Sequence, residues 1–393
     1  MPLVHMKDML VHAYEHGYAV GAFDVVSLDF VKGVMAAAER SRAPVILSLA
    51  ESHFEHYDFE LLMSAVEAAA RRSPVPVAIQ LDHGTSLESA VRAIRLGCNG
   101  VMVDASEADL SDNLARTKAV VKMAHACGVP VEGELGYVPG VEGEDAERHP
   151  GTIAYTTVAE AKGFVERTGV DFLAVSIGTV HGRLKSKAKL DFPRLHSINQ
   201  ALGIPLVIHG GTGLDDDQFR RLIARGVAKI NYYTALADAA GVSIRARAKS
   251  APGAGYTMLV KDVSEAITTE AERCMRVWGG AGRAAEVLSH CRSWTAVEHL
   301  IIHNVTGISE KEAAAMMAEG RQALGTIPGV REVVTGRAVK EGSQYRYCWL
   351  VRFAAPEVIN SYREHPVHVV FANQRFRPVA DGRISIDYAL EEA

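Results

Sequence analysis

Short continuous runs of apolar and β-branched residues recur along the first two thirds of the chain, separated by segments with an apolar residue every three or four positions. The runs are typical of strands buried in a parallel sheet, and the segments are typical of amphipathic helices. The pattern predicts strands at residues 18–23, 44–49, 75–81, 100–104, 130–134, 171–177, 204–209 and 228–231. The clearest predicted helices are residues 58–72, 87–96, 109–126, 158–168 and 215–224.

The residues that flank these helices support the assignment. Asp109 begins one of them, where a carboxylate can accept the free backbone N–H groups of the first turn. Gly97, Gly128, Gly169 and Gly226 follow four of the predicted helices, and glycine commonly ends a helix. Eight strand–helix units in about 230 residues match the size of a closed (β/α)8 TIM barrel. A doubly wound open sheet is the alternative.

The pattern changes in the last third of the chain. Residues after about 240 are mostly helical, notably 260–277, and a glycine-rich break follows at 279–282. A new succession of strand, helix, strand, strand, helix and strand is predicted at 296–304, 310–324, 330–336, 345–353, 356–364 and 382–388. This order is typical of a small ferredoxin-like α+β domain. We therefore expect a barrel domain at residues 1–291 and a second domain at 292–393.

Composition narrows the class of protein. The 393 residues are 48% hydrophobic and 23% charged with a net charge of −5, which predicts a folded protein without a nucleic-acid or membrane partner. The sequence has neither the apolar core of a signal peptide nor the roughly 20 apolar residues of a membrane span. The 5 cysteines have no CxxC spacing, so a disulfide framework or thiolate zinc site is not indicated. A cytoplasmic enzyme is expected.

Three histidines stand where predicted barrel strands end. His83 follows the third strand, His181 the sixth, and His209 ends the seventh. Closure of a barrel brings the carboxyl ends of its strands to one rim, where chemistry in this fold takes place. Three imidazoles with one open position are the ligand set of a catalytic zinc, so we favour a metal site. The alternative is that each histidine is a separate polar loop residue.

Glycine-rich segments after the last two strands indicate a second kind of site. Residues 210–213 read Gly-Gly-Thr-Gly after the seventh strand, and residues 231–234 follow the eighth. Backbone N–H groups of such turns can hold a phosphate, and barrels often bind one at these two loops. A phosphorylated substrate is therefore favoured over a purely geometric role for the glycines.

Seven ordered motifs resemble one known family. They are LDHG (81–84), VMVDAS (101–106), EGELG (132–136), AVSIGTVHG (174–182), LDF (190–192), VIHGGTG (207–213) and GVAKINYYT (226–234). Over about residues 1–285 the chain resembles the class II, zinc-dependent ketose-bisphosphate aldolases, most closely the branch with fructose- and tagatose-bisphosphate aldolases. The resemblance implies reversible cleavage of a phosphorylated ketose into dihydroxyacetone phosphate and an aldehyde.

The resemblance also implies a role for individual residues. Zn²⁺ would be held by His83, His181 and His209, with Asp104 and Glu134 beside it for a second or displaced ion, and a monovalent cation, Na⁺ or K⁺, is a further implied cofactor. Asp82 would be the acid/base at the C4 oxygen, and Glu142, in the loop after the fifth strand, would move the proton at C3. The implied dihydroxyacetone phosphate site consists of Gly182, Gly210, Gly211, Thr212, Asn231, Tyr232, Tyr233 and Thr234.

Two alternatives to zinc catalysis stay open at this stage. Cleavage next to a ketone needs either a Lewis-acid metal or a lysine Schiff base, and Lys229 lies in a predicted barrel strand. A lysine there is more often structural, so we favour the metal. A second alternative is a regulatory barrel that binds metal without turnover and leaves ligand binding and dimerisation to the C-terminal domain.

Some positions depart from the family pattern. Asp24 stands where the family usually has an asparagine in the first strand, and Tyr232 and Tyr233 stand where smaller or acidic residues are usual. Ala50 replaces a serine that is common after the second strand, although Ser52 is close by. The loop VPGVEGEDAERHPG lacks the usual double glycine. An extra carboxylate and bulky rings near the substrate would disfavour a second phosphate, so the identity of the aldehyde product is left open.

The C-terminal region resembles the stress-responsive dimeric α/β-barrel family. The motifs are VEHLI (297–301), IPGV (327–330), HPVH (365–368) and IDY (386–388). Members pair through their sheets, which implies a homo-oligomer, either a homodimer or a homotetramer, and would cover open sheet edges. Some relatives bind ligands inside that barrel, and His303, His365 and His368 are candidates for such a role. A dimerisation module with structural histidines is the favoured interpretation.

Overall fold

The computed structural model describes residues 2–140, 143–146, 153–183 and 188–389. The chain divides into two compact units, one formed mainly by residues up to Ser293 and the other mainly by residues from Trp294 onward. We retain 1–291 and 292–393 as the proposed domains. No helix among the described residues has the length and apolar character needed to cross a membrane.

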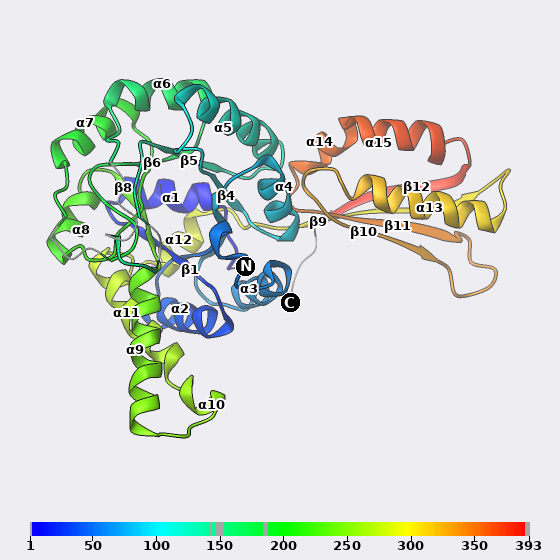
Figure 1. Ribbon diagram of the computed structural model, residues 1–393. Helices are drawn as coiled ribbons and strands as arrows, with labels where there is room; N and C mark the ends of the chain where they lie inside the picture. Colours follow the sequence, from blue (N-terminus) through cyan, green and yellow to red (C-terminus); the bar gives the residue numbers. More distant parts are fainter. Residues whose placement is uncertain (1, 141–142, 147–152, 184–187, 390–393) are drawn as a thin grey trace. The chain divides into compact units, whose positions relative to one another are not determined.

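The first unit is a closed barrel of parallel strands (Figure 1). The strands are β1 (Val20–Asp24), β2 (Val45–Ala50), β3 (Val77–Gly84), β4 (Gly100–Val103), β5 (Val131–Leu135), β6 (Phe172–Val175), β7 (Leu206–Ile208) and β8 (Val227–Tyr232). Pairing of β1 with β8, for example Ala22 with Asn231, closes the ring. The predicted (β/α)8 barrel is therefore confirmed, and the open sheet is excluded.

Helices follow the strands around this barrel (Figure 1). They are α2 (Leu28–Ser41), α3 (Phe59–Arg71), α4 (Leu87–Leu96), α5 (Leu110–His125), α6 (Val158–Thr168), α7 (Phe192–Leu202) and α8 (Asp216–Ile223). Thr157 and Asp215 each form a capping box, which satisfies free N–H groups at the starts of α6 and α8. Gly169 ends α6 with φ +77°, a conformation that glycine adopts without strain.

The amino ends of the strands are closed by α1 (Met6–Glu15). Met6, Met9 and Leu10 belong to one buried cluster with Ile46 of β2 and Ala78 of β3. Burying such side chains contributes roughly 1.5–3 kcal/mol each. The predicted site residues lie at the opposite, carboxyl ends of the strands.

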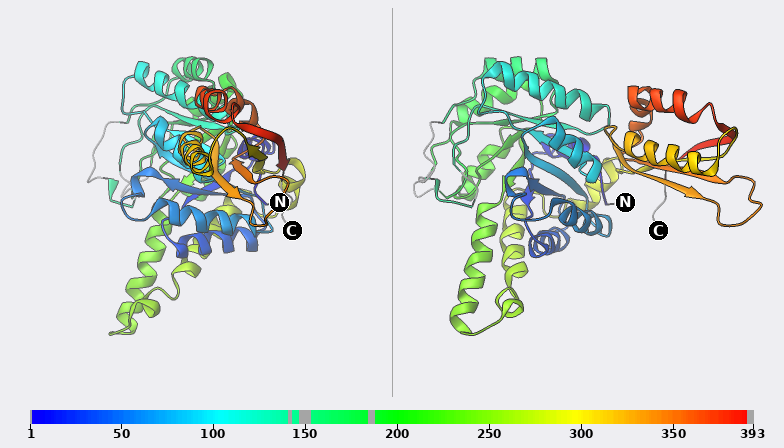
Figure 2. Two further views of the ribbon diagram at one scale, coloured as in Figure 1. Left: turned by 90° about the vertical axis from the view of Figure 1, so that its right-hand side faces the viewer. Right: turned by 45° about the vertical axis from the view of Figure 1, so that its right-hand side comes forward.

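Four further helices complete the first unit: α9 (Thr234–Ser250), α10 (Tyr256–Leu259), α11 (Val263–Val277) and α12 (Ala284–His290). α9 and α11 form a hairpin whose far end, with α10, extends away from the barrel (Figure 2). α11 packs closely on α2, because a Cβ at Gly33 would lie 2.7 Å from the Ile267 side chain. These helices confirm the predicted helical region after residue 240.

The second unit is a four-stranded antiparallel sheet covered by helices. Its elements are β9 (Val297–Val305), α13 (Glu310–Leu324), β10 (Val330–Arg337), β11 (Tyr347–Phe353), α14 (Val358–Glu364), α15 (Pro366–Phe371), a π-helical turn (Ala372–Phe376) and β12 (Ala380–Ala389). The sheet order β10-β11-β9-β12 confirms the ferredoxin-like prediction. The pattern did not predict α15, which begins anew at Pro366 because proline suits the first turn and the His365 ring accepts the Val367 N–H.

Candidate active site

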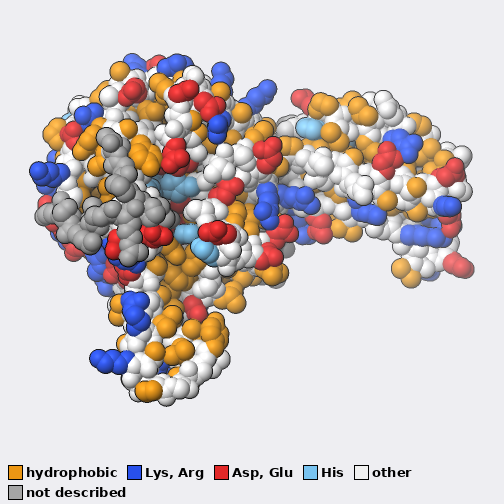
Figure 3. All heavy atoms as spheres, in the orientation of Figure 1, with side chains coloured by type: hydrophobic (Ala, Val, Ile, Leu, Met, Phe, Trp, Pro, Cys, Tyr) orange, Lys and Arg blue, Asp and Glu red, His pale blue; other side chains and the backbone are white. Residues whose placement is uncertain are grey.

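The barrel brings His83, His181 and His209 together at the carboxyl ends of its strands. Their ring centroids lie 4.6 to 5.8 Å apart, and one nitrogen of each ring lies within 4.8 Å of the others. We call these three residues the strand-end cluster. Histidine (pale blue) and acidic (red) side chains gather near the middle of this barrel face in Figure 3.

Local backbone features place the histidines. His83 has φ +45°, an unusual left-handed conformation for a residue with a Cβ. The His181 N–H donates to Pro139 O at 2.8 Å, so the loop after β5 holds the segment after β6. Gly140 permits this contact, because at φ +107° its Cβ would lie 2.3 Å from His181 O. The position of His181 therefore depends on a neighbouring loop as well as on its own strand.

Carboxylates orient two of the rings. His83 Nδ1 donates to Asp104 Oδ2 at 2.7 Å, and His209 Nε2 donates to Glu132 Oε1 at 3.0 Å. The lone pairs of His83 Nε2 and His209 Nδ1 then face each other at 3.0 Å. Two such lone pairs repel unless a positive charge, either a proton or a metal ion, lies between them. This donor set fits Zn²⁺, which prefers neutral imidazoles whose second N–H is held by an outer partner.

The electrostatics of the site also favour a cation. Burial alone would lower the pKa of His83, but the charges of Asp82 and Asp104 raise it well above the usual value. Burial would raise the pKa of Asp104, yet its hydrogen bond with His83 and the charge of that ring lower it strongly. Asp104 therefore stays ionised beside the rings. The carboxylates concentrate negative charge at this place, and a bound metal ion would balance that charge.

A buried polar network lies beneath the strand-end cluster. Lys229 Nζ donates to Glu132 Oε2 at 2.7 Å and to Asn231 Oδ1 at 2.6 Å. Asn231 Nδ2 donates to Asp82 Oδ2 at 2.9 Å, and Gln80 Nε2 donates to Glu132 Oε2 at 2.9 Å. All five side chains are fully or almost fully buried. Hydrogen bonds thus connect His209, through Glu132, to Asp82.

Glu132 and Gln80 were not among the residues predicted for the site. The available signal was a charged or amide residue within an otherwise apolar strand, two positions before the predicted site residue. Side chains two apart on a strand point to the same face, so Glu132 accompanies Glu134, and Gln80 accompanies Asp82. Burial would raise the pKa of Glu132, but Lys229 and His209 lower it to about 2. Lys229 is held by two acceptors, which favours its structural role over a Schiff base.

Two carboxylates retain an oxygen available to a ligand. Asp82 Oδ1 and Glu134 Oε2 are buried without a hydrogen-bond partner among the described residues. Burial and the charge of Asp104 raise the pKa of Glu134 well above its usual value. Glu134 also lies with His83 and Asp104 in a second group whose ligand atoms are within 4.8 Å of one another. The acidic residues predicted beside the metal are therefore brought together.

The predicted phosphate loops meet at the ends of β6, β7 and β8. Gly210 has φ +68°, and a Cβ there would lie 2.3 Å from Val180 O. Thr212 Oγ1 accepts the Ala235 N–H at 3.3 Å, which ties the loop after β7 to the start of α9. Only glycine at residue 210 permits this close approach. Gly182 has φ +82° on the neighbouring segment.

Glu142 lies outside the described residues. The next residue, Gly143, donates its N–H to Thr234 Oγ1 at 3.0 Å, and its carbonyl accepts Arg183 Nη1 at 2.8 Å. Arg183 also forms an ion pair with Asp238 of α9. Part of the loop after β5 is thus anchored at the end of β8.

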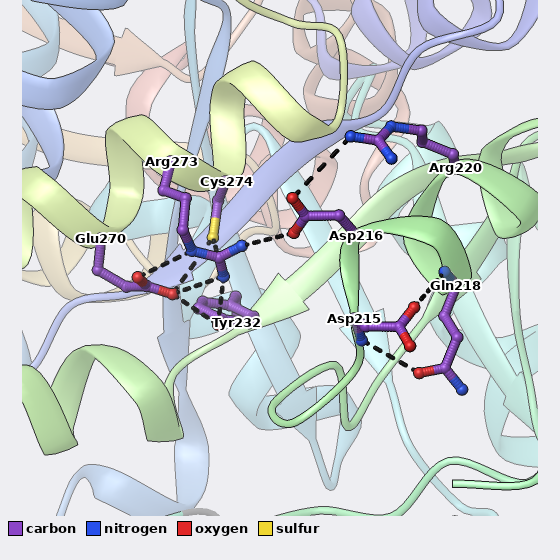
Figure 4. Close-up of polar contacts among 8 residues, drawn as sticks. All are labelled: Asp215, Asp216, Gln218, Arg220, Tyr232, Glu270, Arg273 and Cys274. Carbon is purple, nitrogen blue, oxygen red and sulfur yellow. Dashed lines mark hydrogen bonds and ion pairs between the residues drawn. The ribbon is translucent and has the colours of Figure 1, made fainter. Parts of the chain in front are cut away.

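Tyr232 points away from the strand-end cluster. Its ring packs against Trp278, and its hydroxyl donates to Glu270 Oε1 at 2.8 Å, in a group completed by Arg273 and Cys274 (Figure 4). Because side chains alternate along β8, Asn231 faces the barrel interior and Tyr232 faces α11. The side-chain role predicted for Tyr232 at the substrate is therefore not supported by its position.

Tyr233 lies at the carboxyl rim. Its ring centroid is 4.5 Å from that of His53, which follows β2. Asp24 is completely buried at the end of β1, and it adds to burial in raising the pKa of Tyr57. Two of the departures from the family pattern, Asp24 and Tyr233, therefore lie at neighbouring strand ends.

A cavity of about 690 Å³ opens beside His83 and His181. Asp104, Glu134 and Tyr137 line it near the histidines, and Glu51, Thr85 and Arg116 are among its outer residues. Its volume suits a small sugar phosphate, since ligand sites commonly span roughly 300–1,000 Å³.

Comparison with known proteins agrees with this geometry. The profile of the class II fructose-bisphosphate aldolase family matches residues 4–283. The chain belongs to this family. Class II aldolases are aldehyde-lyases, and the barrel, the motif order and the residues at the strand ends of this chain agree with that membership.

Individual relatives support the same assignment. The probable fructose-bisphosphate aldolase of Bacillus subtilis (strain 168) is 42% identical over 237 residues, which are 60% of this chain and 82% of that protein. The fructose-bisphosphate aldolase of Staphylococcus aureus (strain Mu50) is 40% identical over 248 residues, 62% of this chain and 86% of that protein. The crystal structure of the YdjI aldolase from Escherichia coli K12 has a TM-score of 0.63 and 32% identity, and the match covers 72% of this aldolase and 99% of that chain.

The C-terminal unit of the aldolase matches a second family, the stress-responsive A/B barrel domain, at residues 297–390. His368 lines a cavity of about 260 Å³ in this unit, together with His299, whose Nδ1 lies 2.6 Å from Asp387 Oδ1. His303 is buried against Tyr347 and bonded to Asn304 O, and His365 caps α15. Of the three histidines considered from sequence, only His368 lines this cavity, and His299 was missed.

Proposed function

We propose that this aldolase is zinc dependent and reversibly cleaves a phosphorylated ketose into dihydroxyacetone phosphate and an aldehyde. The observation that carries the proposal is the pair of ring nitrogens, His83 Nε2 and His209 Nδ1, facing each other at 3.0 Å with their N–H groups turned to carboxylates. With His181 they would hold the ion. Zinc acts as a Lewis acid, which polarises the ketose carbonyl and stabilises the negative charge left by C3–C4 cleavage.

Asp82 is proposed to move the proton of the C4 hydroxyl. Asn231 holds Asp82 Oδ2, so Oδ1 is the oxygen that accepts the proton as the C3–C4 bond breaks. Such a proton transfer typically contributes ~10²–10⁴-fold to the rate. The alternative role of Asp82, orienting a ligand histidine, is less supported, because Asp104 and Glu132 already orient His83 and His209.

Glu142 is proposed, from its motif, to protonate C3 after cleavage. The anchored neighbour Gly143 joins the end of β8 through Thr234, which is itself a proposed substrate-binding residue. We propose that the phosphate of the dihydroxyacetone phosphate half is held by the loops that contain Gly182, Gly210, Gly211, Thr212 and the residues 231–234. The close approach of Gly210 to Val180 O supports this loop geometry.

Members of the family differ in the part of the ketose that becomes the aldehyde product. The names of the relatives favour fructose 1,6-bisphosphate, with tagatose 1,6-bisphosphate as its stereoisomer. Asp24 and Tyr233 at the strand ends favour an aldehyde with less negative charge than glyceraldehyde 3-phosphate, because a carboxylate repels a second phosphate. We propose the class of ketose 1-phosphates and 1,6-bisphosphates as substrates.

The experiment that tests this function joins metal content to substrate choice. Purified full-length protein is analysed for zinc, and release of dihydroxyacetone phosphate is measured from a panel of ketose phosphates with and without chelator. We expect release that the chelator abolishes and zinc restores. Release that is insensitive to chelation would overturn the zinc proposal. Bound zinc without release from any ketose would instead support a regulatory barrel.

We also propose that the C-terminal unit pairs with a second copy of itself through its open sheet face. Val334, Leu350, Leu300 and Ile386 lie opposite one another in a row across all four strands. Val334 and Ile386 are each about 40% exposed, so this row is an apolar face directed away from the helices. Ile386→Glu places a charge on this face and is expected to halve the mass of the oligomer in light scattering, from dimer to monomer or from tetramer to dimer. An unchanged mass would contradict pairing through this face.

The cavity of the C-terminal unit supports a second candidate function, binding of a small anion. Arg363, Arg377 and Arg383 line it with His299 and His368, and none of the three arginines forms an ion pair with a described residue. Asp387 also lines the cavity, where its carboxylate lies 2.6 Å from His299 Nδ1, so the three arginines leave the wall with a net positive charge. Such a wall around an apolar floor suits a carboxylate or phosphate with an apolar body. Calorimetry with aryl carboxylates and phosphates, compared between wild type and Arg383→Gln, tests this; equal affinities would contradict it.

A further inference from the structure

A second group of metal-type side chains lies on two helices at the amino ends of the barrel strands. His12 of α1 lies one turn before His16, the residue that caps the carboxyl end of α1, and Glu286 and His290 are one turn apart on α12. Residues four apart on a helix share a face. The two helices pack together, so both pairs point to the same place. We call His12, His16 and Glu286 the helix cluster.

The distances within the helix cluster match a metal site. Glu286 Oε1 lies 3.3 Å from His12 Nε2 and 3.7 Å from His16 Nε2. Ligand atoms around a tetrahedral Zn²⁺ with bonds near 2.1 Å are roughly 3.4 Å apart. The three ligand atoms lie within 4.8 Å of one another. The ring of His290 is centred 5.0 Å from that of His12, close enough to supply a fourth ligand after a rotation of its side chain.

Outer hydrogen bonds prepare these atoms for a cation. His16 Nδ1 donates to His12 O at 2.8 Å, which leaves the lone pair on Nε2. His12 Nδ1 is bonded to the buried Tyr18 hydroxyl at 2.9 Å, so its Nε2 is the atom that faces Glu286. Arg283 holds Glu286 Oε2 at 3.0 Å and leaves Oε1 turned to the rings. Ligand histidines are commonly held by such bonds from the second ring nitrogen.

We propose that the helix cluster is a second divalent metal site, suited to Zn²⁺, separate from the strand-end cluster. Two imidazoles and a carboxylate are a common zinc ligand set, and His290 or water completes it. The helix cluster lacks glycine-rich phosphate loops and buried acid/base carboxylates, so the ion has a structural role. It fastens α1, which closes the barrel floor, to α12. Binding of the ion to the folded state alone stabilises that state by mass action.

Zinc counting on full-length protein tests the proposal. His16→Gln removes one ligand from an exposed side chain, and His209→Asn removes one from the strand-end cluster. His196→Gln, on the exposed face of α7, is the matched control. Each protein is stripped with chelator, dialysed against Zn²⁺ and analysed for zinc, and its folding is checked by circular dichroism.

We expect His16→Gln and His209→Asn each to bind one Zn²⁺ per chain fewer than wild type, and the double variant to bind two fewer. His196→Gln should equal wild type. Zn²⁺ should raise the Tm of His209→Asn and leave the Tm of the double variant unchanged. If His16→Gln and Glu286→Gln both bind as much Zn²⁺ as wild type, the proposal is wrong. The zinc content of His209→Asn tests the strand-end cluster and therefore the proposed function. The zinc contents of His16→Gln and Glu286→Gln test the helix cluster, so the two proposals can fail separately.

Discussion

The strand-end cluster and the helix cluster use the same kinds of side chain at opposite ends of one barrel, yet they are built differently. His83, His181 and His209 come from three strand ends and are oriented by carboxylates within a buried polar network. His12 and His16 come from the last turn of α1 and its C-cap, and the His16 side chain is 42% exposed. The first group depends on barrel closure, and the second on the packing of two helices.

This difference indicates which end can perform chemistry. Catalysis needs proton-transfer groups and a substrate cradle next to the metal-type ligands, and a set of ligands alone does not provide them. At the carboxyl end, we propose that Asp82 and the loop of Gly210 provide both. At the amino end, Arg283 occupies the second oxygen of the one carboxylate in the helix cluster. The same ligand types therefore support catalysis at one end and anchoring at the other.

The largest expected effect is on turnover. Asp82→Asn keeps an oxygen for Asn231 Nδ2 but cannot take the C4 proton, so kcat should fall by ~10²–10⁴-fold. Steady-state retro-aldol kinetics measure this, with zinc content determined in parallel. Asp217→Asn on the exposed surface of α8 is the matched control, and His16→Gln should also retain wild-type kcat. A fall of less than tenfold with zinc retained would show that the carboxylate does not transfer the proton.

The next largest effect is on stability. Lys229→Met leaves Glu132 as a buried charge without its ion-pair partner, which should lower the free energy of unfolding by about 3–5 kcal/mol. Urea denaturation followed by fluorescence measures it. Lys162→Met breaks an exposed pair with Glu166 on α6 and should cost less than about 1 kcal/mol. Equal losses in both variants would contradict the assignment of Lys229 to a buried network.

A smaller effect is expected at the phosphate loop. Gly210→Ala introduces a Cβ against Val180 O at a positive φ, which should cost about 1–3 kcal/mol and raise KM for phosphorylated ketoses. Gly203→Ala shares the positive φ at the end of α7 but meets nothing within 4 Å, so it separates backbone strain from the clash. If both variants had wild-type KM, Gly210 would not be part of the phosphate site.

The smallest expected effect is a pH dependence at the amino end. Burial would raise the pKa of Asp8, but hydrogen bonds from Arg292 and the charge of that guanidinium lower it below its ordinary value. A lowered folded pKa stabilises the protein above the unfolded pKa, and this contribution disappears as pH falls through the folded value. Asp8→Asn should therefore destabilise by up to about 1 kcal/mol at pH 7.

The difference between Asp8→Asn and wild type should vanish once pH falls below the folded pKa of Asp8. Urea denaturation at several pH values measures it. A difference that stays constant down to the most acidic pH at which the protein folds would contradict the ionic origin of the contact between Asp8 and Arg292.

Much of the site was predictable because its residues follow strands with a clear period. His83, His209, Asp104 and Glu134 end or follow apolar runs, and the shared direction of parallel strands places their side chains together. The network of Lys229 and Glu132 was not predicted, because partners across the barrel depend on which residues of β5 and β8 point inward at the same height. The direction of Tyr232 was missed for the same reason.

The sequence alone determined the order of strands and helices, the histidines at the strand ends and the division into a barrel and an α+β region. These features depend on local periodicity and on capping, which neighbouring residues specify. The tertiary structure decided which charged side chains meet inside the barrel and that His12 of α1 meets Glu286 of α12. Such contacts join residues far apart in the chain, so only barrel closure and side-chain packing bring them within bonding distance.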